Sequence, residues 1–580
     1  MDQRNIASGT PIPSKFYCDQ PYIVITDEGS WLCVMTTGLG EEGASGQHIV
    51  STVSCDQGKT WTDLQYIEDP DSPESSWATP LKLPSGRIYV FYTFNKDNLR
   101  EVITEAPHTI DRVDTVGYMM YKYSDDHGKS WSKERYRLPI RNFAIDRNNP
   151  YGGDMQFFWS VSKPLVGNDG CVYIGNAKVG KFGEGFHEIS EGVILKSANI
   201  LTEQDPAKIV WETLPDGETG IRSPVGLVSD EHNVTYLNDG SLYVTFRTVA
   251  GYNGHAYSRD GGHTWQETGF AEYSPGGPKI KHPRAANFVR RHQNGHYTLW
   301  FHNNGTDQTR TPGQAYLDRN PAWLSGGIEK DGHLYWSQPE IVLYDHDPQV
   351  RISYPDFIED QGKLFISETQ KWVARTHEVD RSLLEGMWNQ FENNQVAQRG
   401  LRLEWTEIGP STSFKLPAVS TGTAAEDQAG VHTEFSIEMK IKAADFSREA
   451  VIFDATDGGR AGILVSTTAR KTVKITLNDG RCESGWECDP GLLVEHRDHH
   501  LTIIVDGGPR LILFVVDGVL CDGGTHRKFG WGRFDPLLRF VDIAAEAKLH
   551  AGSAVQVSLF RFYDRYLRVS EAVGNYRSTL

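Results

Sequence analysis

An eight-residue pattern, Ser-x-Asp-x-Gly-x-Ser/Thr-Trp, occurs three times in the chain and constrains the fold more than any other feature. The copies are residues 54–61, 124–131 and 258–265. In such a stretch the aspartate caps backbone amides of a tight turn, and the glycine takes the strained backbone angle. The tryptophan then packs between strands. The pattern therefore predicts a protein built from repeated β-hairpins.

Six tryptophans open similar phrases and give the period of the repeat. Successive members lie 54 to 80 residues apart, and they are Trp61, Trp131, Trp211, Trp265, Trp336 and Trp405. Each interval also holds an apolar strand, a glycine turn and a second strand, as in residues 234–248 with their Asn-Asp-Gly turn. Units of this length predict an all-β fold with a six-bladed β-propeller of four-stranded sheets.

The composition and the strand pattern of the sequence change after the sixth tryptophan. We expect the propeller to span residues 1–408, with a short helix at residues 383–398. Residues 409–425 are rich in Pro, Ser, Thr and Gly and read as a linker. Residues 426–580 hold short alternating strands that predict a β-sandwich. Residues 558–577 resemble the end of concanavalin-like and laminin-G-like jelly rolls, which implies a domain that binds glycans or, as we favour, braces a catalytic partner.

Charge and hydropathy exclude several classes of protein. A net charge of −18 argues against a groove for nucleic acid, because neutralising phosphates requires clustered Lys and Arg. No apolar run of about 18 residues is present, so no membrane span is expected. Residues 1–14 lack the apolar core of a signal peptide. We expect a cytoplasmic protein, or a secreted or periplasmic one if a leader has been removed.

The cysteines and histidines do not suggest a metal centre. Seven cysteines in 580 residues do not make a disulfide framework. Cys482 and Cys488 are close enough in sequence to bridge a small loop, or to remain two free thiols. The chain has no Cys-x-x-Cys pair and no His-Glu-x-x-His motif, so neither a zinc site nor any other cofactor is expected.

The inner strands of a propeller begin near its axis, at one mouth of the central channel. Residues at corresponding positions in each sheet, before its first glycine turn, should therefore gather around one pocket. Those residues are Asp19 and Gln20, Trp77, Trp159 and Lys163, Glu231, Arg284, and Tyr354. Acidic, basic, aromatic and phenolic groups would converge there, which is typical of a binding site.

Two members of this ring suggest a reaction. If Glu231 and Tyr354 pair across the axis, the carboxylate can take the proton of the phenol and make it a nucleophile. Glycosidases normally use two carboxylates, and a tyrosine nucleophile is the known exception in sialidases. The exception has an electrostatic reason, because a sugar with a carboxylate on its anomeric carbon would repel an attacking carboxylate.

Residues 15–405 resemble the sialidase superfamily. The three repeated turns are typical of it, and Glu231 is followed sixteen residues later by Arg247 in a phrase that matches the family. The resemblance implies that Glu231 polarises the nucleophile Tyr354 and that Arg247 holds the carboxylate of the substrate. Arg319 resembles the family's third arginine, and Glu368 resembles an acidic residue that orients an arginine.

The resemblance also implies a general acid/base in residues 38–50. Glu42 is the first candidate there, with Glu41 and His48 behind it. One position departs from the family, because its first arginine is replaced by the phrase Asp19-Gln20-Pro21. That loss removes a charge-assisted hydrogen bond worth roughly 1.5–3 kcal/mol. Asp19 would also repel an anionic substrate unless it is paired, and Arg284 or Arg222 could compensate from another blade.

These observations favour an exo-acting, retaining glycoside hydrolase of sialidase type, which removes a terminal sialic acid or related ulosonic acid from a glycan. Tyr354, Glu231 and Glu42 would be catalytic. The residues expected to bind substrate are Arg247, Arg319, Arg284, Asp19, Gln20, Glu368, His48 and Trp159. The alternatives are a polysaccharide lyase or a hydrolase of neutral or uronic sugars that uses Asp19, Glu42 or His48, and a non-catalytic glycan-binding protein. A glycan is the expected partner in each case.

Overall fold

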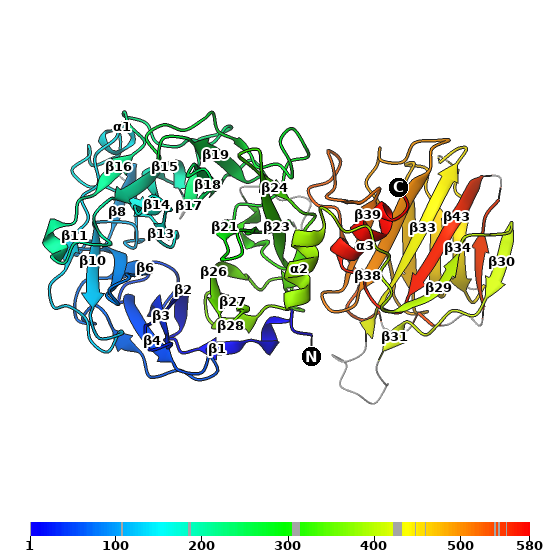
Figure 1. The fold of residues 1–580 in the computed structure, drawn as a ribbon, viewed down its shortest axis with the longest axis horizontal. Coiled ribbons are helices and arrows are strands. Elements are labelled where there is room, and N and C mark those ends of the chain that lie inside the picture. Colours follow the sequence, from blue (N-terminus) through cyan, green and yellow to red (C-terminus); the bar gives the residue numbers. More distant parts are fainter. Residues whose placement is uncertain are drawn as a thin grey trace. The chain divides into compact units, whose positions relative to one another are not determined.

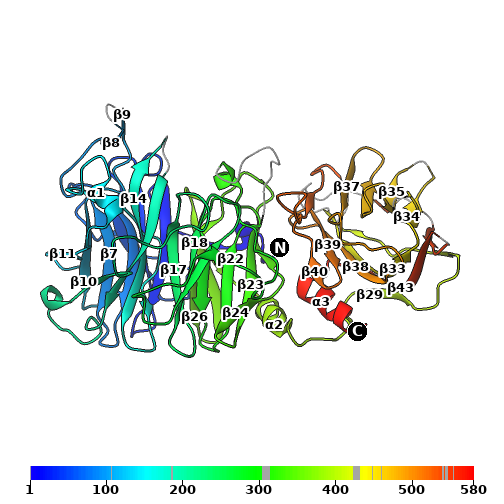
Figure 2. The same cartoon turned by 90° about the horizontal axis from the view of Figure 1, so that it is seen from above.

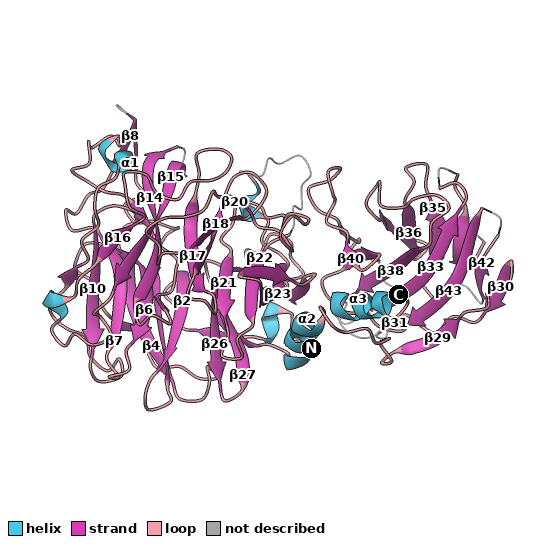
Figure 3. Ribbon diagram, turned by 45° about the horizontal axis from the view of Figure 1, so that its top comes forward, coloured by secondary structure: helices cyan, strands magenta, loops and turns pink. Residues whose placement is uncertain are grey.

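The computed structural model describes residues 2–105, 108–183, 187–303, 314–421, 432–446, 448–458, 460–538, 541–542, 546–552 and 554–580. Strands dominate the fold, and the few helices are short (Figure 3). The chain divides into two compact units. The first unit comprises residues 3–336 and 347–381, and the second comprises Asp2 with residues 337–346 and 382–580.

Antiparallel sheets make up the first unit, each built from consecutive strands (Figure 1). The first sheet contains β2 (Tyr17–Ile25), β3 (Trp31–Gly38), β4 (His48–Ser54) and β5 (Gln65–Tyr66). The second contains β6 (Ser75–Lys82), β7 (Ile88–Phe94), β10 (Tyr118–Ser124) and β11 (Tyr136–Arg137). The third sheet contains β12 (Phe158–Trp159), β13 (Leu165–Val166), β14 (Val172–Phe182), β15 (His187–Ser197) and β16 (Glu212–Leu214). The fourth contains β17 (Asp230–Tyr236), β18 (Leu242–Arg247), β19 (Gly254–Ser258) and β20 (Gly269–Phe270). The fifth sheet contains β21 (Phe288–Arg291), β22 (Tyr297–Phe301), β23 (Ala322–Lys330) and β24 (His333–Trp336). The sixth contains β26 (Ser353–Asp360), β27 (Lys363–Thr369) and β28 (Ala374–Glu378), together with β1 (Thr10–Ile12). Short elements connect them: β8 (Val102–Glu105), β9 (His108–Ile110), α1 (Ala144–Arg147), η1 (Ile6–Ser8), η2 (Pro206–Lys208) and η3 (Ala315–Leu317).

The six sheets of the described residues follow one another around a common centre (Figure 1). Their strands run along one common direction when the unit is seen from the side (Figure 2). Hydrogen bonds join neighbouring sheets, for example from the amide of Trp77 to Thr36 Oγ1 at 2.9 Å. The amide of Ile23 in the first sheet donates to Asp356 Oδ2 of the sixth at 2.8 Å. The predicted all-β fold with six repeated sheets is confirmed, and the third sheet has a fifth short strand, β13.

The repeated turns have the hydrogen bonds that the sequence pattern predicts. In the first copy, Ser54 Oγ donates to Asp56 Oδ1 at 2.8 Å and accepts the amide of Gly58 at 2.8 Å. Asp56 Oδ1 also accepts the amide of Thr60 at 2.8 Å. The copies at residues 124–131 and 258–265 repeat these contacts. Bonds from Thr60 and Ser54 lower the pKa of Asp56 to about 2, so the carboxylate stays charged and caps the turn.

Apolar cores lie between neighbouring sheets. One of them packs Val34 and Ile49 of the first sheet against Val90 and Tyr92 of the second, with Trp131 at its edge. The tryptophan of the repeated turn thus fills the space between sheets, as expected. The sixth tryptophan does not mark a sheet of this unit, because β29 (Leu401–Trp405) pairs with a strand of the second unit. The amino-terminal strand β1 completes the sixth sheet instead.

The second unit consists mainly of two antiparallel sheets. One has the order β29, β43 (Val555–Tyr563), β33 (Phe435–Ala443), β38 (His499–Asp506), β39 (Leu511–Val516), β40 (Val519–Leu520), with β41 (Gly532–Arg533) beside β39. The other has the order β30 (Ser411–Phe414), β42 (Ala547–His550), β34 (Val451–Thr456), β35 (Gly462–Thr467), β36 (Val473–Asn478), β37 (Glu483–Glu487). Its remaining elements are β25 (Glu340–Leu343), α2 (Arg381–Asn389, whose first residue belongs to the first unit), β31 (Ser420–Thr421), β32 (His432–Thr433) and α3 (Val569–Arg577).

One apolar core joins the two sheets into a sandwich, with Phe435, Ile503 and Phe560 from one sheet and Phe453 and Ile475 from the other. The division of the chain differs from the expected boundary at residue 408. Strands β29 and β30 belong to the sandwich sheets, and β30 lies within the expected linker of residues 409–425. The expected helix at residues 383–398 spans Arg381–Asn389. A jelly-roll relationship for this unit stays a prediction.

The seven cysteines are all free thiols, so Cys482 and Cys488 do not form a disulfide. Both lie on the second sandwich sheet or next to it, and Cys488 is fully buried in the apolar core. Among the described residues, none of the helices has the length and apolar character needed to cross a membrane.

A close approach between the third and fourth sheets provides a test of the ring. A Cβ atom added to Gly175 in β14 would lie 2.0 Å from the carbonyl oxygen of His232 in β17. We expect Gly175→Ala to lower the free energy of unfolding by about 1–3 kcal/mol, because the two backbones must move apart. Chemical denaturation measures this loss. In the control Gly409→Ala the nearest atom would lie 3.9 Å away, and a variant pair of equal stability would contradict this packing.

Candidate active site at the centre of the first unit

Four inner strands carry the same backbone irregularity where they approach the centre. In β2, β6, β17 and β26 the pairing register shifts, and one residue within each shift has positive φ. These residues are Gln20 (54°), Trp77 (64°), Glu231 (53°) and Tyr354 (48°). The left-handed region costs a residue with a Cβ atom about 1–2 kcal/mol. Such bulges re-aim side chains and occur preferentially beside active sites.

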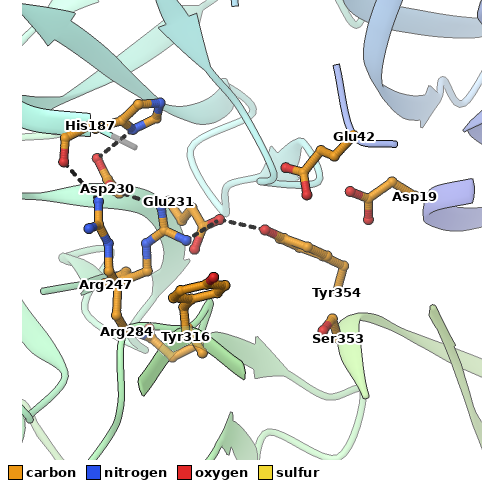
Figure 4. Close-up of polar contacts among 12 residues, drawn as sticks. Asp19, Glu42, His187, Asp230, Glu231, Arg247, Arg284, Tyr316, Ser353 and Tyr354 are labelled. Carbon is orange, nitrogen blue, oxygen red and sulfur yellow. Dashed lines mark hydrogen bonds and ion pairs between the residues drawn. The ribbon is translucent and has the colours of Figure 1, made fainter. Parts of the chain in front are cut away.

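Two of these strained residues meet at the centre (Figure 4). Tyr354 Oη donates a hydrogen bond to Glu231 Oε1 over 2.8 Å. Both residues are buried, with exposures of 2% and 0%. Burial, and then the charge of Glu231, raise the pKa of Tyr354 well above its ordinary value. The phenol is therefore neutral, and its proton already points at a carboxylate.

Arg247 fixes the carboxylate of this pair. Its Nη1 lies 3.1 Å from Glu231 Oε1, and its Nη2 lies 2.8 Å from Asp230 Oδ2. His187 Nδ1 contacts the other oxygen of Asp230 at 3.2 Å. Although burial raises the pKa of Asp230, His187 and Arg247 hold it well below its usual value. Arg247 is therefore engaged by two carboxylates of the protein, although the resemblance implied a carboxylate of the substrate.

Two further arginines lie near the pair. Arg319 Nη1 donates to Ser353 Oγ at 2.9 Å and its Nε donates to the carbonyl of Tyr316 at 2.8 Å, while its guanidinium lies 5.7 Å from the ring of Tyr354. Among the described residues Arg319 forms no ion pair. Arg284 Nη2 donates to the carbonyl oxygen of His187 at 2.8 Å. Burial, and then the charge of Arg247, lower the pKa of Arg284 to about 10.

The opposite side of Tyr354 is acidic and is organised by a lysine. Lys371 Nζ lies 2.5 Å from Asp19 Oδ2, 3.1 Å from Glu42 Oε2 and 4.4 Å from the centre of the Tyr354 ring. Tyr17 Oη donates to Asp19 Oδ2 at 2.8 Å. Asp19 is therefore paired, which is the condition under which it would not repel an anionic substrate.

The two carboxyl groups around Lys371 differ in burial and in charge. Asp19 is fully buried, and burial raises its pKa against the opposing effect of Lys371. The side chain of Glu42 is 24% exposed and has a second cationic partner, Arg112 Nη2, at 3.2 Å. Burial raises the pKa of Glu42, but Lys371 and Arg112 outweigh it and hold that pKa well below its usual range. Glu42 is thus a carboxylate that ligands can reach.

Two predicted substrate-binding residues have other roles. Gln20 Nε2 donates to the carbonyl of Ser160 at 2.9 Å, so this side chain joins the first sheet to the third. His48 lies on β4, two strands away from the centre, and its ring nitrogens contact the carbonyl oxygens of Gly46 and Ser72 at 3.1 and 2.9 Å. A histidine held by backbone groups at this distance from Tyr354 is not the acid/base of the pair.

The prediction for Glu368 is also corrected. Its Oε1 accepts from Gln370 Nε2 at 2.6 Å and lies 3.1 Å from His377 Nε2, so it orients no arginine of the site. Glu41 is exposed, and its carbonyl oxygen, rather than its carboxylate, accepts from Gln47. Trp159 is placed by its backbone on β12, and its side chain lies outside the described residues.

Several residues of the site have no clear signal in the sequence. Asp230 could have been noticed, because it directly precedes Glu231 at the bulge. Lys371 follows β27 in a turn, Arg112 lies in the connection before β10, and His187 is the first residue of β15. Only the folded chain brings them to the centre. Among the described residues no group of three or more His, Cys, Asp or Glu side chains is arranged to hold a metal ion.

The buried ion pairs predict how stability depends on pH. Asp230→Asn would leave His187 without its carboxylate and Arg247 with Glu231 alone, and should lower the free energy of unfolding by about 3–5 kcal/mol at neutral pH. In the wild type the pKa of Asp230 is lower in the folded chain, so the unfolded chain takes up the proton first on acidification. Stability therefore falls from about pH 5 downwards, and the variant should show a smaller fall.

Urea unfolding of both proteins between about pH 7 and about pH 3 measures this difference. Asp63→Asn, which changes an exposed carboxylate of the same unit, serves as the control and should follow the wild type. Equal losses on acidification in wild type and Asp230→Asn would show that Asp230 is not an important proton-linked group.

A family model described as BNR/Asp-box repeat matches residues 122–133, which hold the second copy of the repeated turn. Among solved structures, the chain is similar to a protein of unknown function from Dyadobacter fermentans, with 16% identity, a TM-score of 0.45, and coverage of 64% of this chain and 97% of the other. It is also similar to Trypanosoma rangeli sialidase (14% identity, TM-score 0.44, coverage 99% and 97%) and to the NanB sialidase from Streptococcus pneumoniae (12%, 0.44, 64% and 70%). The Asp-box turns on six antiparallel sheets give the first unit a sialidase-like fold.

Proposed function

We propose that the protein is an exo-acting, retaining glycoside hydrolase of sialidase type, which removes a terminal acidic sugar from a glycan. The observation that carries this proposal is the 2.8 Å hydrogen bond from Tyr354 to Glu231, beside the guanidinium of Arg319. A neutral phenol with a carboxylate positioned to take its proton is the arrangement that a tyrosine nucleophile requires.

In the first half of the reaction Tyr354 Oη bonds to the anomeric carbon and passes its proton to Glu231. The bond between the anomeric carbon and the leaving oxygen breaks, and that oxygen takes a proton from Glu42. In the second half a water molecule attacks the same carbon and gives a proton to the carboxylate of Glu42. Tyr354 Oη then leaves and recovers its proton from Glu231. Two displacements at one carbon retain its configuration.

Glu42 suits the acid/base role because its carboxylate is partly exposed, whereas Asp19 is enclosed. In the unliganded site Lys371 and Arg112 keep Glu42 ionised, as the second half of the reaction requires. A carboxylate on the bound sugar would add a like charge nearby and favour protonation of Glu42, as the first half requires.

The distribution of charge supports an acidic sugar. Arg319 forms no ion pair with a described residue, and Arg284 adds a second positive charge near Glu231, whereas Arg247 is held by Asp230 and Glu231. A substrate carboxylate would bind there and gain charge-assisted hydrogen bonds. On the other side, Lys371 neutralises Asp19 where the sialidase superfamily has its first arginine. Arg284 lies in a different part of the ring of sheets from Asp19. It would there compensate for the missing first arginine of the family.

A panel of aryl glycosides tests the proposal. Glycosides of sialic acid and related ulosonic acids are compared with those of uronic and neutral sugars, and release of the aryl alcohol is followed. Turnover of ulosonic acid glycosides with retained configuration is expected. Products that absorb in the near ultraviolet, as unsaturated uronates do, would indicate a lyase instead, and binding without any product would indicate a lectin.

Tyr354→Phe tests the nucleophile. Loss of the hydroxyl should abolish turnover of the best aryl glycoside, because it removes the oxygen that bonds to the anomeric carbon. The circular dichroism spectrum and melting temperature should remain close to those of the wild type. Tyr118→Phe is the matched control, because that hydroxyl makes only a 3.5 Å contact with Asp97 and its loss should leave the rate unchanged. Turnover by Tyr354→Phe at the wild-type rate would refute the assignment.

The leaving group identifies the acid. Glu42→Gln should reduce kcat about 10²–10⁴-fold for a substrate with a poor, alkyl leaving group, which needs a proton. The loss should be much smaller for a nitrophenyl glycoside, whose leaving group departs without one. Asp19→Asn, measured in parallel, should lower both rates by the same factor. If only Asp19→Asn shows the dependence on leaving group, Asp19 is the acid and Glu42 is not.

A further inference from the structure

A cavity lies between the inner strands of the first unit, beyond the candidate active site. It has a volume of about 250 Å³ and is lined by residues of β2, β17, β21 and β26 and by the segment that leads into β13. These elements surround the centre in Figure 1. On β26 the cavity begins at Pro355, directly after Tyr354, and on β17 it spans Asn233–Tyr236, just after Glu231. It therefore extends farther along the same strands, over offsets of one to five residues, or roughly 3–17 Å at 3.3 Å per residue, from Tyr354 and Glu231.

The charged lining of this cavity is mostly cationic. Lys163, Arg290 and Arg291 face one carboxylate, Asp356, and no other lining residue carries a charge. The lining thus has a net charge of +2 in a chain whose net charge is −18. Pro355, Phe357 and Val289 supply apolar wall, which lowers the local dielectric and strengthens the field of the cations.

Two of the three cations have partners within the protein. Lys163 Nζ binds Asp356 Oδ2 at 2.6 Å and the carbonyl oxygen of Ile23. Arg291 donates to Tyr236 Oη at 3.2 Å and to Asn238 Oδ1 at 2.9 Å. The carboxylate of Asp356 also accepts the amide of Ile23, so its capacity is used.

Arg290 is different. Its guanidinium forms no hydrogen bond or ion pair with any described residue, and its Nε atom is buried. Its charge acts on Lys163, whose pKa is lowered by burial in spite of Asp356, with Arg290 adding to the lowering. Two like charges in a half-enclosed, partly apolar cavity repel each other, and an anion between them would remove that repulsion and satisfy the guanidinium.

We propose that this cavity is a binding site for a small oxyanion, a phosphate or a carboxylate, held by Arg290 with Lys163 beside it. A guanidinium offers parallel N–H groups that match two oxygens of either anion. The volume is below the range of about 300–1,000 Å³ that is common for larger ligands. The site therefore takes a free anion or the acidic group of a single small metabolite. It is separate from the candidate active site and does not depend on the proposed hydrolase activity.

Titration calorimetry of the full-length protein with inorganic phosphate, and separately with acetate, tests the site. The titrations use a buffer without oxyanions at low, constant ionic strength. One saturable event with a Kd of about 1 mM or tighter is expected for at least one of the two anions. The stronger of the two identifies the class of ligand. Absence of saturable binding of both anions would overturn the proposal.

Variants locate the anion. Arg290→Gln should weaken anion binding about tenfold or more. Arg290→Lys keeps the charge but loses the parallel N–H groups of the guanidinium, so its affinity should lie between those of Arg290→Gln and the wild type. Arg137→Gln removes an exposed arginine of β11 and should bind like the wild type. Tyr354→Phe should also bind like the wild type, since it changes only the candidate active site.

Arg319→Gln distinguishes the two cationic sites. If phosphate or acetate binds to Arg290→Gln as tightly as to the wild type but not to Arg319→Gln, the anion occupies the candidate active site and the proposal is wrong. Thermal unfolding of each variant shows that it is folded, and added anion should raise the melting temperature of the wild type more than that of Arg290→Gln. Equal increases in both proteins would contradict the site.

Discussion

The hydrogen bond between Tyr354 and Glu231 joins the first strands of the sixth and fourth sheets, and the rest of the candidate site is arranged around it. Both residues lie where the pairing register of their strand shifts. Each is held at positive φ inside a bulge, at a cost of about 1–3 kcal/mol. The ring of sheets supplies the packing that keeps these strained backbones in place. The proposed catalytic residues are therefore also the strained ones.

Charge is separated across this contact. Arg247 binds Glu231 at the hydroxyl end of Tyr354, whereas Lys371 lies over the ring and holds Asp19 and Glu42. A substrate with an acidic group and a leaving group at opposite faces of one carbon would fit such a division. Asp19, which looked like an obstacle to an anionic sugar, is neutralised inside the protein by a lysine, so the departure from the family's arginine does not by itself exclude that substrate.

Much of the fold followed from short-range physics. The aspartates of the repeated turns bind the backbone groups that their side chains can reach within a few residues, so the pattern alone predicts the turn. The positions of Glu231 and Tyr354 relative to the first glycine turn of their sheets likewise predicted that both lie at the centre. The tryptophan period failed at Trp405, because a tryptophan at the expected interval can also begin a strand of another unit.

Long-range contacts were less predictable. Lys371 meets Asp19 across more than three hundred residues of sequence, and nothing in its neighbourhood indicates that contact. Gln20, His48 and Glu368 had plausible positions, but the direction of each side chain depends on bulges and neighbouring strands that the sequence does not display. The cavity around Arg290 also depends on residues contributed by five sheets.

The three residues of β1 complete the sixth sheet by pairing with β28, so the first and last strands of the unit are neighbours. During translation this amino-terminal segment leaves the ribosome early and has no partner until residue 378 has followed. The ring therefore cannot close while the chain is still growing through the first five sheets. Contacts of such long range slow folding. Early folding must be local, sheet by sheet, and a late joining of the two ends converts a row of sheets into a ring.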